Sequence, residues 1–281
     1  MHVAVRRAAL LLPAWAWLLA FVAAPGALLV VIGLATPADA VPPYRMGLSI
    51  ASLRALADTF YLRALLGSLL TATVVSALCL LIGTPMAMAI ARSRRRQFLL
   101  LLVVFPFWSG MLLRIVAWVG ILRDDGLANA ILLRLHLIKA PIPLLHSDSA
   151  MLLGLVTCYL PFFILPLEAR LAAIGTHYAE AAADLGAPPW RVFRRITFPL
   201  ALPGVWAGLA LVFLPVSGEY VIPEMLGAPA SPMLGRVIWD TFFHEGDWPQ
   251  AAILAVALLI LLLLPAVWLR RGDAGAQVGG L

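Results

Sequence analysis

Long apolar runs without a charged residue dominate this sequence. The first extends from Ala8 to Ala35, and its 28 residues carry no charge. About 20 predominantly apolar residues are enough to cross the hydrocarbon core of a bilayer. Only 12% of all residues are charged, whereas a soluble domain carries about 25%. The runs therefore predict a protein that crosses a membrane several times.

Six such runs divide the chain. We expect an all-α polytopic membrane protein with one transmembrane domain over residues 1–281. The apolar stretch of a secretory signal covers only about 7–15 residues, so the first run is interpreted as a retained helix. The spans are expected at about residues 10–34, 64–91, 98–122, 150–173, 201–222 and 250–269, with a connecting loop at about 174–200.

The basic residues indicate how these helices are oriented. Cytoplasmic connections carry an excess of Arg and Lys. One set of connections holds twelve basic residues and the alternate set holds seven. The twelve are Arg6, Arg7, Arg92, Arg94, Arg95, Arg96, Arg170, Arg191, Arg194, Arg195, Arg270 and Arg271. This bias predicts that both termini and the loop at about 174–200 are cytoplasmic, and it explains the charge of +6 without a nucleic-acid partner.

The sequence lacks the motifs of the common catalytic sites. Its only lysine, Lys139, does not follow the glycine loop that would let it bind the phosphates of ATP. His244-Glu245 lacks the second histidine of a zinc-protease motif. Cys79 and Cys158 lie in apolar runs and are expected to be packing residues. We therefore expect a chain that is not an enzyme and holds neither a metal nor a cofactor.

Two ionisable residues stand well inside the expected spans. Arg114 lies 16 residues past the start of the third run, and Glu219 lies 18 residues past the start of the fifth. At about 1.5 Å per residue both reach a similar depth, near the outer leaflet. Charges at such a depth usually face a partner or a water-filled path. They predict a structural ion pair, a pathway in which Glu219 meets a cationic solute, or both.

The segment EAAADLG predicts a short polar helix between the fourth and fifth runs. We expect it from about His177 to Leu185, with Glu180 and Asp184 on one face because they are four residues apart. Gly186 suits the cap, since a left-handed backbone favours glycine there. A helix this short is not stable alone. It is therefore either a solvated loop helix or a contact for another protein.

The segment after this helix predicts an amphipathic helix at the membrane surface. Trp190, Phe193 and Ile196 recur every three residues, and three arginines lie between Arg191 and Arg195. Apolar and basic faces of this kind are typical of interfacial helices. We expect it to lead into the fifth span.

The spacing of this loop resembles the EAA loop of bacterial ABC importer permeases. The resemblance rests on Glu180-Ala181-Ala182, then Gly186, Ile196 and Pro199, with Phe198 where the family pattern has Leu. It implies a type I ABC importer permease fold with six spans over nearly the whole chain. It also implies that the loop docks on a separate ATPase subunit as a coupling helix. The coupling residues it implies are Glu180, Ala181, Ala182, Asp184, Gly186, Ile196 and Pro199.

A second segment resembles the spermidine/putrescine permeases of that family. It is GEYVIPEMLGAP at residues 218–229, followed by MLGRVIWDTFF and DWPQAA. Permeases for ferric iron, thiamine and other solutes share parts of it, so these solutes stay as alternatives. Carboxylates and aromatic faces attract ammonium ions, although such residues also dock binding proteins or line solvated loops. The candidate pathway residues are Glu219, Tyr220, Glu224, Trp239 and Asp240.

The resemblance implies an assembly in a bacterial inner membrane. Its other members are a second, homologous but different permease, two cytoplasmic ATPase subunits that bind ATP and Mg, and an extracytoplasmic solute-binding protein. Lipid surrounds the spans. A rival from another class is an ion-coupled secondary transporter, which would need no ATPase. An intramembrane enzyme is disfavoured by the absent catalytic motifs.

Overall fold

The apolar runs form helices that are long enough to cross a membrane. The computed structural model describes residues 12–13, 15–38, 40–47, 49–175, 177–229, 231 and 233–276, so residues 10, 11 and 14 of the expected first span lie outside it. Within these ranges, four helices meet the length and hydropathy of a span, at Trp15–Gly33, Thr59–Arg92, Asp148–Ile174 and Pro189–Ser217. Arg96–Ser109 and Met111–Arg134 form a fifth if this bent pair is one span.

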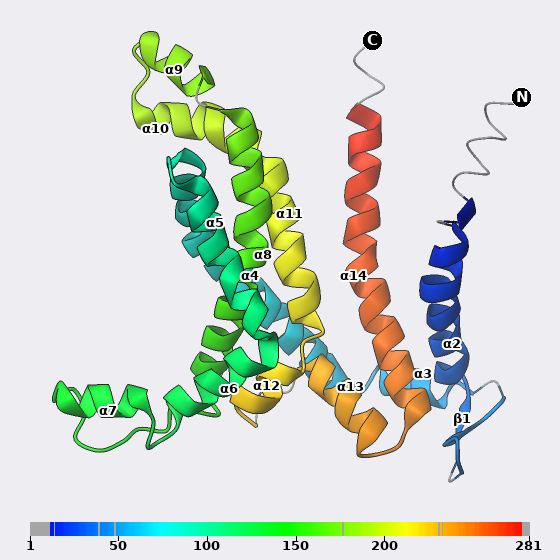
Figure 1. Cartoon of the computed structure of the whole chain (residues 1–281). Helices are drawn as coiled ribbons and strands as arrows, with labels where there is room; N and C mark the ends of the chain where they lie inside the picture. The colour runs from blue at the N-terminus through cyan, green and yellow to red at the C-terminus, as the bar shows by residue number, and fades with distance from the viewer. Residues whose placement is uncertain are drawn as a thin grey trace, which may run out of the picture. The chain divides into compact units, whose positions relative to one another are not determined.

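The chain forms two compact units, one of residues 1–65 with 237–281 and one of residues 66–236. Unit 1 contains the π-helix η1 (Leu19–Ala23), α2 (Ala24–Gly33), α3 (Ala51–Ala55) and α14 (Trp248–Ala276), with a small antiparallel hairpin of β1 (Thr36–Pro37) and β2 (Tyr44–Arg45). Helices α2 and α14 lie side by side and run in opposite directions (Figure 1). A Cβ atom on Gly33 would lie 3.2 Å from the backbone nitrogen of Ile253, so glycine permits this close approach.

Unit 2 is built around a helical pair, α8 (Asp148–Ile174) and α11 (Phe198–Ser217). The helix α4 (Thr59–Arg92) starts in unit 1 and continues into unit 2, and α13 (Leu234–Phe243) starts in unit 2 and continues into unit 1. The other elements of unit 2 are α5 (Arg96–Val104), the 3₁₀ helix η2 (Phe105–Ser109), α6 (Met111–Leu122), α7 (Leu127–Arg134), α9 (His177–Asp184), α10 (Pro189–Val192), the π-helix η3 (Phe193–Thr197) and α12 (Val221–Leu226).

Two glycines one turn apart bring α11 against α8. A Cβ atom on Gly208 would lie 2.9 Å from the carbonyl oxygen of Phe163, and one on Gly204 would lie 3.1 Å from that of Pro166. Small residues at this spacing let helix backbones approach closely in membranes. The ring of Phe163 is fully buried. It also faces Gly83 of α4, where a Cβ atom would lie 2.5 Å from the ring. Phe163 therefore fills the junction of three helices.

Two of the expected spans differ from the structure. The third, 98–122, is broken at Gly110, whose φ of 75° suits glycine, and the chain turns there by 87°. The fifth, 201–222, belongs to a helical run that begins earlier, at Pro189, and ends at Ser217. Pro215 and Gly218 weaken helix continuation at that end. Glu219 therefore lies in the break between α11 and α12, and the expectation that it stands inside a helix is wrong.

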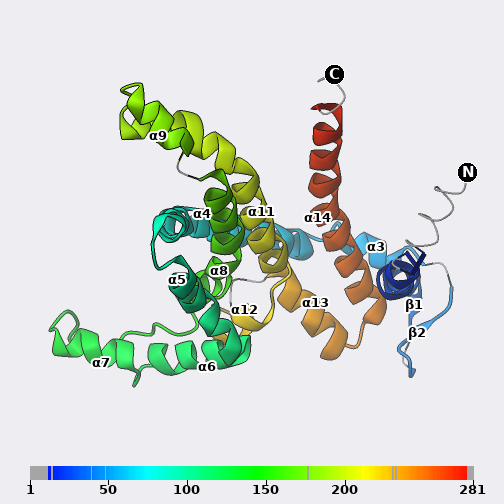
Figure 2. The same cartoon turned by 45° about the horizontal axis from the view of Figure 1, so that its top comes forward.

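The two ends of unit 2 carry different elements. Helices α9 and α10 lie at one end of the α8–α11 pair, whereas α6, α7 and α12 lie at the other (Figures 1 and 2). The loop that resembles the EAA loop is thus at one end, and Glu219 is at the opposite end.

Candidate functional site

The helix α9 confirms the predicted polar helix to within one residue at its C-terminal end, since it covers His177–Asp184. Gly186 has a φ of 77°. Its N–H donates to the carbonyl of Ala183 at 2.8 Å, and the N–H of Ala187 donates to that of Ala182 at 3.0 Å. This pair of bonds is the Schellman motif, which ends a helix at a left-handed residue. No atom lies within 4 Å of a Cβ on Gly186, so its conformation alone requires glycine.

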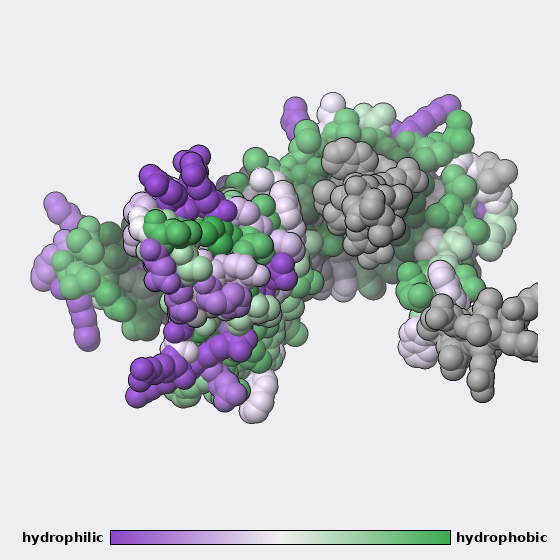
Figure 3. Space-filling view, turned by 90° about the horizontal axis from the view of Figure 1, so that it is seen from above, coloured by the Kyte–Doolittle hydropathy of each residue, from purple (hydrophilic) through white to green (hydrophobic). Residues whose placement is uncertain are grey.

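The end of unit 2 that carries α9 has both charged and apolar groups on its surface. Hydrophilic side chains gather over this end in Figure 3, which looks onto it. Glu180 and Asp184 are both exposed. Leu185 is 89% exposed, and Trp190 is also exposed. The segment around α9 thus exposes a leucine and a tryptophan beside its acidic residues.

The expected amphipathic helix is joined to the fifth span. Residues Pro189–Ser217 form one helical run through α10, the π-helix η3 and α11, so the expected helix leads directly into the fifth span. Its place at the membrane surface stays a prediction. Ile196 lies half-buried in η3, and Pro199 follows this π-helix in the first turn of α11. The carbonyl of Leu200 accepts a hydrogen bond from Nε of Arg170 at 3.0 Å, which ties this run to α8.

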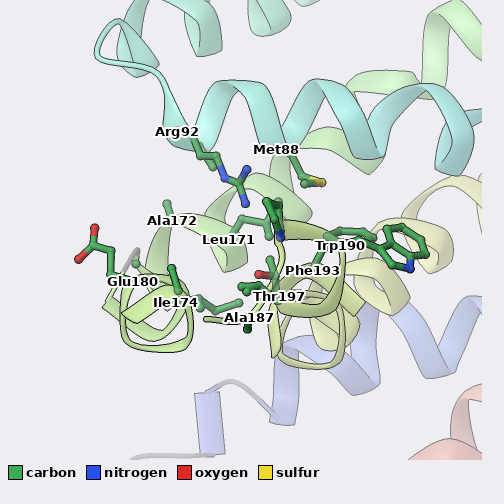
Figure 4. A pocket seen from close by; sticks show the side chains of 15 residues that line it. Met88, Arg92, Leu171, Ala172, Ile174, Glu180, Ala187, Trp190, Phe193 and Thr197 are labelled. Atoms are coloured by element: carbon green, nitrogen blue, oxygen red, sulfur yellow. The ribbon is translucent and has the colours of Figure 1, made fainter. Parts of the chain in front are cut away.

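A cavity of about 710 Å³ lies between this loop and the ends of α4 and α8 (Figure 4). Its walls come from the end of α4, the end of α8 and the segment from α9 to η3. Met88 and Arg92 reach from α4 towards the cavity, whereas the carboxylate of Glu180 points away from it.

A buried carboxylate near this cavity was not singled out by sequence reasoning. Glu168 of α8 is 2% exposed and forms a bidentate ion pair with the guanidinium of Arg96, which is 43% exposed. By its place in the sequence, Arg96 indicates only the orientation of the spans. The signal that could have found the pair is an acid six residues before the end of an apolar helix, together with an arginine at the start of the preceding span. The pair ties α5 to α8.

At the opposite end, Glu219 is buried in the break after α11. Its carboxylate accepts a hydrogen bond from the hydroxyl of Tyr159 and another, at 3.1 Å, from the N–H of Val221. A Cβ atom on Gly235 would lie 2.6 Å from the carbonyl oxygen of Glu219, so glycine is required beside this break. The carboxylate is therefore held in one position by α8 and by the start of α12.

Arg114 lies in the same region without a direct ion pair to Glu219. Its guanidinium carbon lies 5.3 Å from the ring centre of Phe107, and its Nε donates to the carbonyl of Gly110 at 3.4 Å. Its Nη1 is buried and, among the described residues, has no hydrogen-bond partner. The expected direct contact with Glu219 is replaced by contacts of each residue with its own neighbours, because the bend at Gly110 turns α6 away from α5.

A second cavity, of about 450 Å³, lies beside Arg114 and Tyr159. Arg114 and Tyr159 both line it, and Glu219 binds the hydroxyl of Tyr159. The remaining walls are mostly apolar and come from η2, α6, α8 and α11. The cavity can present an arginine and a phenol to a solute, whereas the carboxylate of Glu219 lies behind the hydroxyl of Tyr159.

The other expected pathway residues lie in different surroundings. Glu224 of α12 forms an ion pair with Arg236 at 2.7 Å, and Tyr220 precedes α12. Trp239 and Asp240 belong to the part of α13 in unit 1. Asp240 pairs with His244 at 3.2 Å, and Trp239 stacks on Phe243 with ring centres 4.1 Å apart. Unit 2 therefore contains Glu219, Tyr220 and Glu224, whereas unit 1 contains Trp239 and Asp240.

The sequence matches a known family over most of its length. The model of the binding-protein-dependent transport system inner membrane components matches residues 8–271. The chain belongs to this family. It is therefore an integral membrane component of a transport system, and the family role is that of a permease component and not of a catalytic subunit.

Several curated members of the family are similar in sequence. The spermidine/putrescine transport system permease protein PotB of Haemophilus influenzae is 33% identical over 252 residues, which cover 89% of this chain and 88% of that protein. PotB of Escherichia coli K12 is 34% identical over 256 residues, covering 90% and 93%. The molybdenum transport system permease protein ModB of Mycobacterium bovis is 32% identical over 211 residues, covering 74% and 78%.

Solved structures share the fold of this family member. A chain of a bacterial ABC transporter that imports the acidic polysaccharide alginate has a TM-score of 0.67 at 20% identity, with 94% of each chain covered. A chain of the MetNI methionine ABC transporter, in inward-facing conformations, has a TM-score of 0.56 at 17% identity, covering 75% of this chain and 94% of that chain. The fold is thus that of ABC importer permeases.

Proposed function

We propose that this family member is the permease subunit of an ATP-driven ABC importer and that α9 is its coupling helix. The coupling role is supported by the position of α9, which lies exposed at the end of the α8–α11 pair. The helix is followed by the exposed Leu185 and is capped by Gly186. The residues that make the contact are Glu180, Ala181, Ala182, Asp184 and Gly186, with Ile196 and Pro199 placing the helix that follows. ATP and Mg bind to the partner ATPases, and this chain carries no cofactor.

The proposed topology has six spans in one transmembrane domain. The broken pair α5–α6 supplies the third span, and α14 supplies the sixth. Both termini are cytoplasmic, because the basic residues of the alternate connections favour that side. The loop with α9 is then cytoplasmic and Glu219 lies towards the outer side. The membrane is the bacterial inner membrane.

The proposed assembly contains this chain, a second permease, two ATPase subunits and an extracytoplasmic binding protein. An alginate transporter structure contains a pentasaccharide-bound periplasmic protein, which supports the presence of a binding protein in such assemblies. A difference between the two permeases is expected from the resemblance to spermidine/putrescine systems.

The proposed solute is a polyamine. The PotB proteins named above are spermidine/putrescine permeases and share about one third of their residues with this chain. We propose that the buried carboxylate of Glu219, which accepts a hydrogen bond from Tyr159, favours a cationic solute, although Arg114 also lines the cavity. Tyr220, Glu224, Trp239 and Asp240 are proposed to guide the cation from the binding protein towards Glu219. Ferric iron and thiamine are the alternative solutes.

Purification and transport test this proposal together. The chain is extracted from membranes in mild detergent, and an ATPase subunit is expected to copurify. Proteoliposomes containing the complex are then given ATP inside, binding protein outside and labelled spermidine, with ferric iron, thiamine and molybdate as competitors. ATP-dependent uptake that only polyamines inhibit supports the proposal. Uptake by the chain alone under an ion gradient would instead assign it to the secondary transporters.

A further inference from the structure

The segment after Gly110 forms an arm that turns away from the direction of α5. Met111–Arg134, which includes α6 and α7, makes an angle of 87° with Arg96–Ser109. Figures 1 and 2 show α6 and α7 following one another away from the α8–α11 pair. If α5 runs across the membrane, an arm at nearly a right angle to it lies in the plane of the membrane.

The length of α5 places this arm within the outer part of the bilayer. Nine α-helical residues and five 3₁₀ residues give a rise of roughly 24 Å. The hydrocarbon core is about 30 Å thick. A chain that enters at the cytoplasmic surface at Arg96 therefore turns before it has left the apolar core. Trp108, at the turn, is 84% exposed, as is typical of aromatic residues in the interface.

One face of α7 is apolar and uncovered within this chain. Leu127, Ile131 and Leu135 lie on one stripe, because each is four residues from the next, and all three are exposed. At about 100° per residue, Asn129 lies on the opposite face. Its amide exchanges two hydrogen bonds of 3.0 Å with the backbone of Ile142, so the following loop covers that side.

The side chains around this stripe are better suited to contact with lipid than with another protein. Arg134 at the end of α7 and Lys139 in the following loop are both exposed. Basic side chains beside an apolar helical stripe are the pattern of helices that lie in a membrane interface, where the cations meet lipid phosphates. The hydrogen bonds of Asn129 orient α7 so that its apolar stripe faces outwards.

We infer that the α6–α7 arm lies in the outer leaflet, with Leu127, Ile131 and Leu135 in contact with lipid acyl chains. The occupant of this face is lipid and not the second permease or the binding protein. The arm holds α6, which carries Arg114 in its first turn, at a fixed depth in the membrane. This inference rests on the proposed topology, since it takes Arg96 as cytoplasmic.

Spin labelling of the assembled transporter in proteoliposomes tests the inference. Leu127→Cys, Ile131→Cys and Leu135→Cys are each labelled with a nitroxide, and Asp125→Cys is the matched control because Asp125 lies just before α7 and is 77% exposed. Cys79 and Cys158 are buried, and labelling of the unsubstituted chain gives the background. Oxygen concentrates in lipid and a neutral nickel chelate in water, so the ratio of their accessibilities reports the environment.

The expected result is a higher accessibility to oxygen than to nickel at the three stripe positions, with the reverse at position 125. Higher accessibility to nickel at the stripe would overturn the inference, because the arm would then lie in water. Protection from both reagents would also overturn it and would assign the face to another subunit. Each labelled complex is tested separately for ATP-dependent uptake, so a failure of the proposed function is distinguished from a failure of the lipid contact.

Discussion

Replacing Gly208 with alanine tests whether the backbones of α8 and α11 are in direct contact. The new methyl group would lie 2.9 Å from both the carbonyl oxygen and a ring carbon of Phe163. Those distances are shorter than real methyl contacts, and the carbonyl cannot rotate away. Gly208→Ala must therefore push the two helices apart.

The expected change in the free energy of unfolding combines two opposing effects. Overpacking of a filled core costs about 1–3 kcal/mol. The change from glycine to alanine in a helix returns about 1 kcal/mol. Gly120→Ala is the matched control, because Gly120 lies in α6 and no atom lies within 4 Å of a Cβ there. The difference between the two variants thus isolates the steric effect, about 2 kcal/mol.

The assay uses the native cysteines as reporters of unfolding. Cys79 and Cys158 are both buried, so a thiol-reactive fluorescent dye labels them only when the protein opens. At about 2–4 °C per kcal/mol, the Tm of Gly208→Ala is expected to lie about 6 °C below that of Gly120→Ala. If both variants raise the Tm equally, the two backbones are not in contact and the packing described for α8 and α11 is incorrect.

Three further predictions concern the two ends of the pair. Gly186→Ala strains the left-handed cap by about 1 kcal/mol, so the chain should insert normally while solute-stimulated ATPase activity falls; unchanged stimulation would exclude the coupling role. Glu219→Gln keeps an oxygen for the hydroxyl of Tyr159 but removes the charge. The apparent KM for cation uptake should therefore rise about tenfold, equivalent to about 1.4 kcal/mol. Tyr159→Phe keeps the charge and should change this KM less. Arg96→Gln should lower the Tm more than Glu168→Gln, because it leaves the buried carboxylate without its cation; equal effects would show that burial of Glu168 is unimportant.

Local chemistry explains which parts of this architecture could be predicted. The end of α9 followed from the glycine and proline residues that close it, since a left-handed cap is a property of a few neighbouring residues. The long spans followed from apolar length. These features depend on local stretches of sequence, and α9 ends only one residue before its predicted end.

The remaining features depend on contacts between distant residues. The run 98–122 is apolar throughout except for Arg114, so hydropathy alone did not distinguish a straight span from one that turns at Gly110. The partner of Glu219 was missed because Tyr159 is 60 residues away and lies on α8. Glu168 was missed for a similar reason, since its cation, Arg96, precedes it by 72 residues.

The spacing of Gly204 and Gly208 limits how α8 and α11 can move. A slide of α11 by one helical turn, about 5.4 Å, would carry either Val212 or Gly204 into the slot opposite Phe163. Valine does not fit there, and the opposite slide would bring the side chain of Leu200 into the narrow slot of Gly204. The two helices therefore keep their register, so they are expected to tilt together and not to slide past one another. Under the proposed coupling role, a force applied at α9 would reach Tyr159 and Glu219 as a tilt of the whole pair.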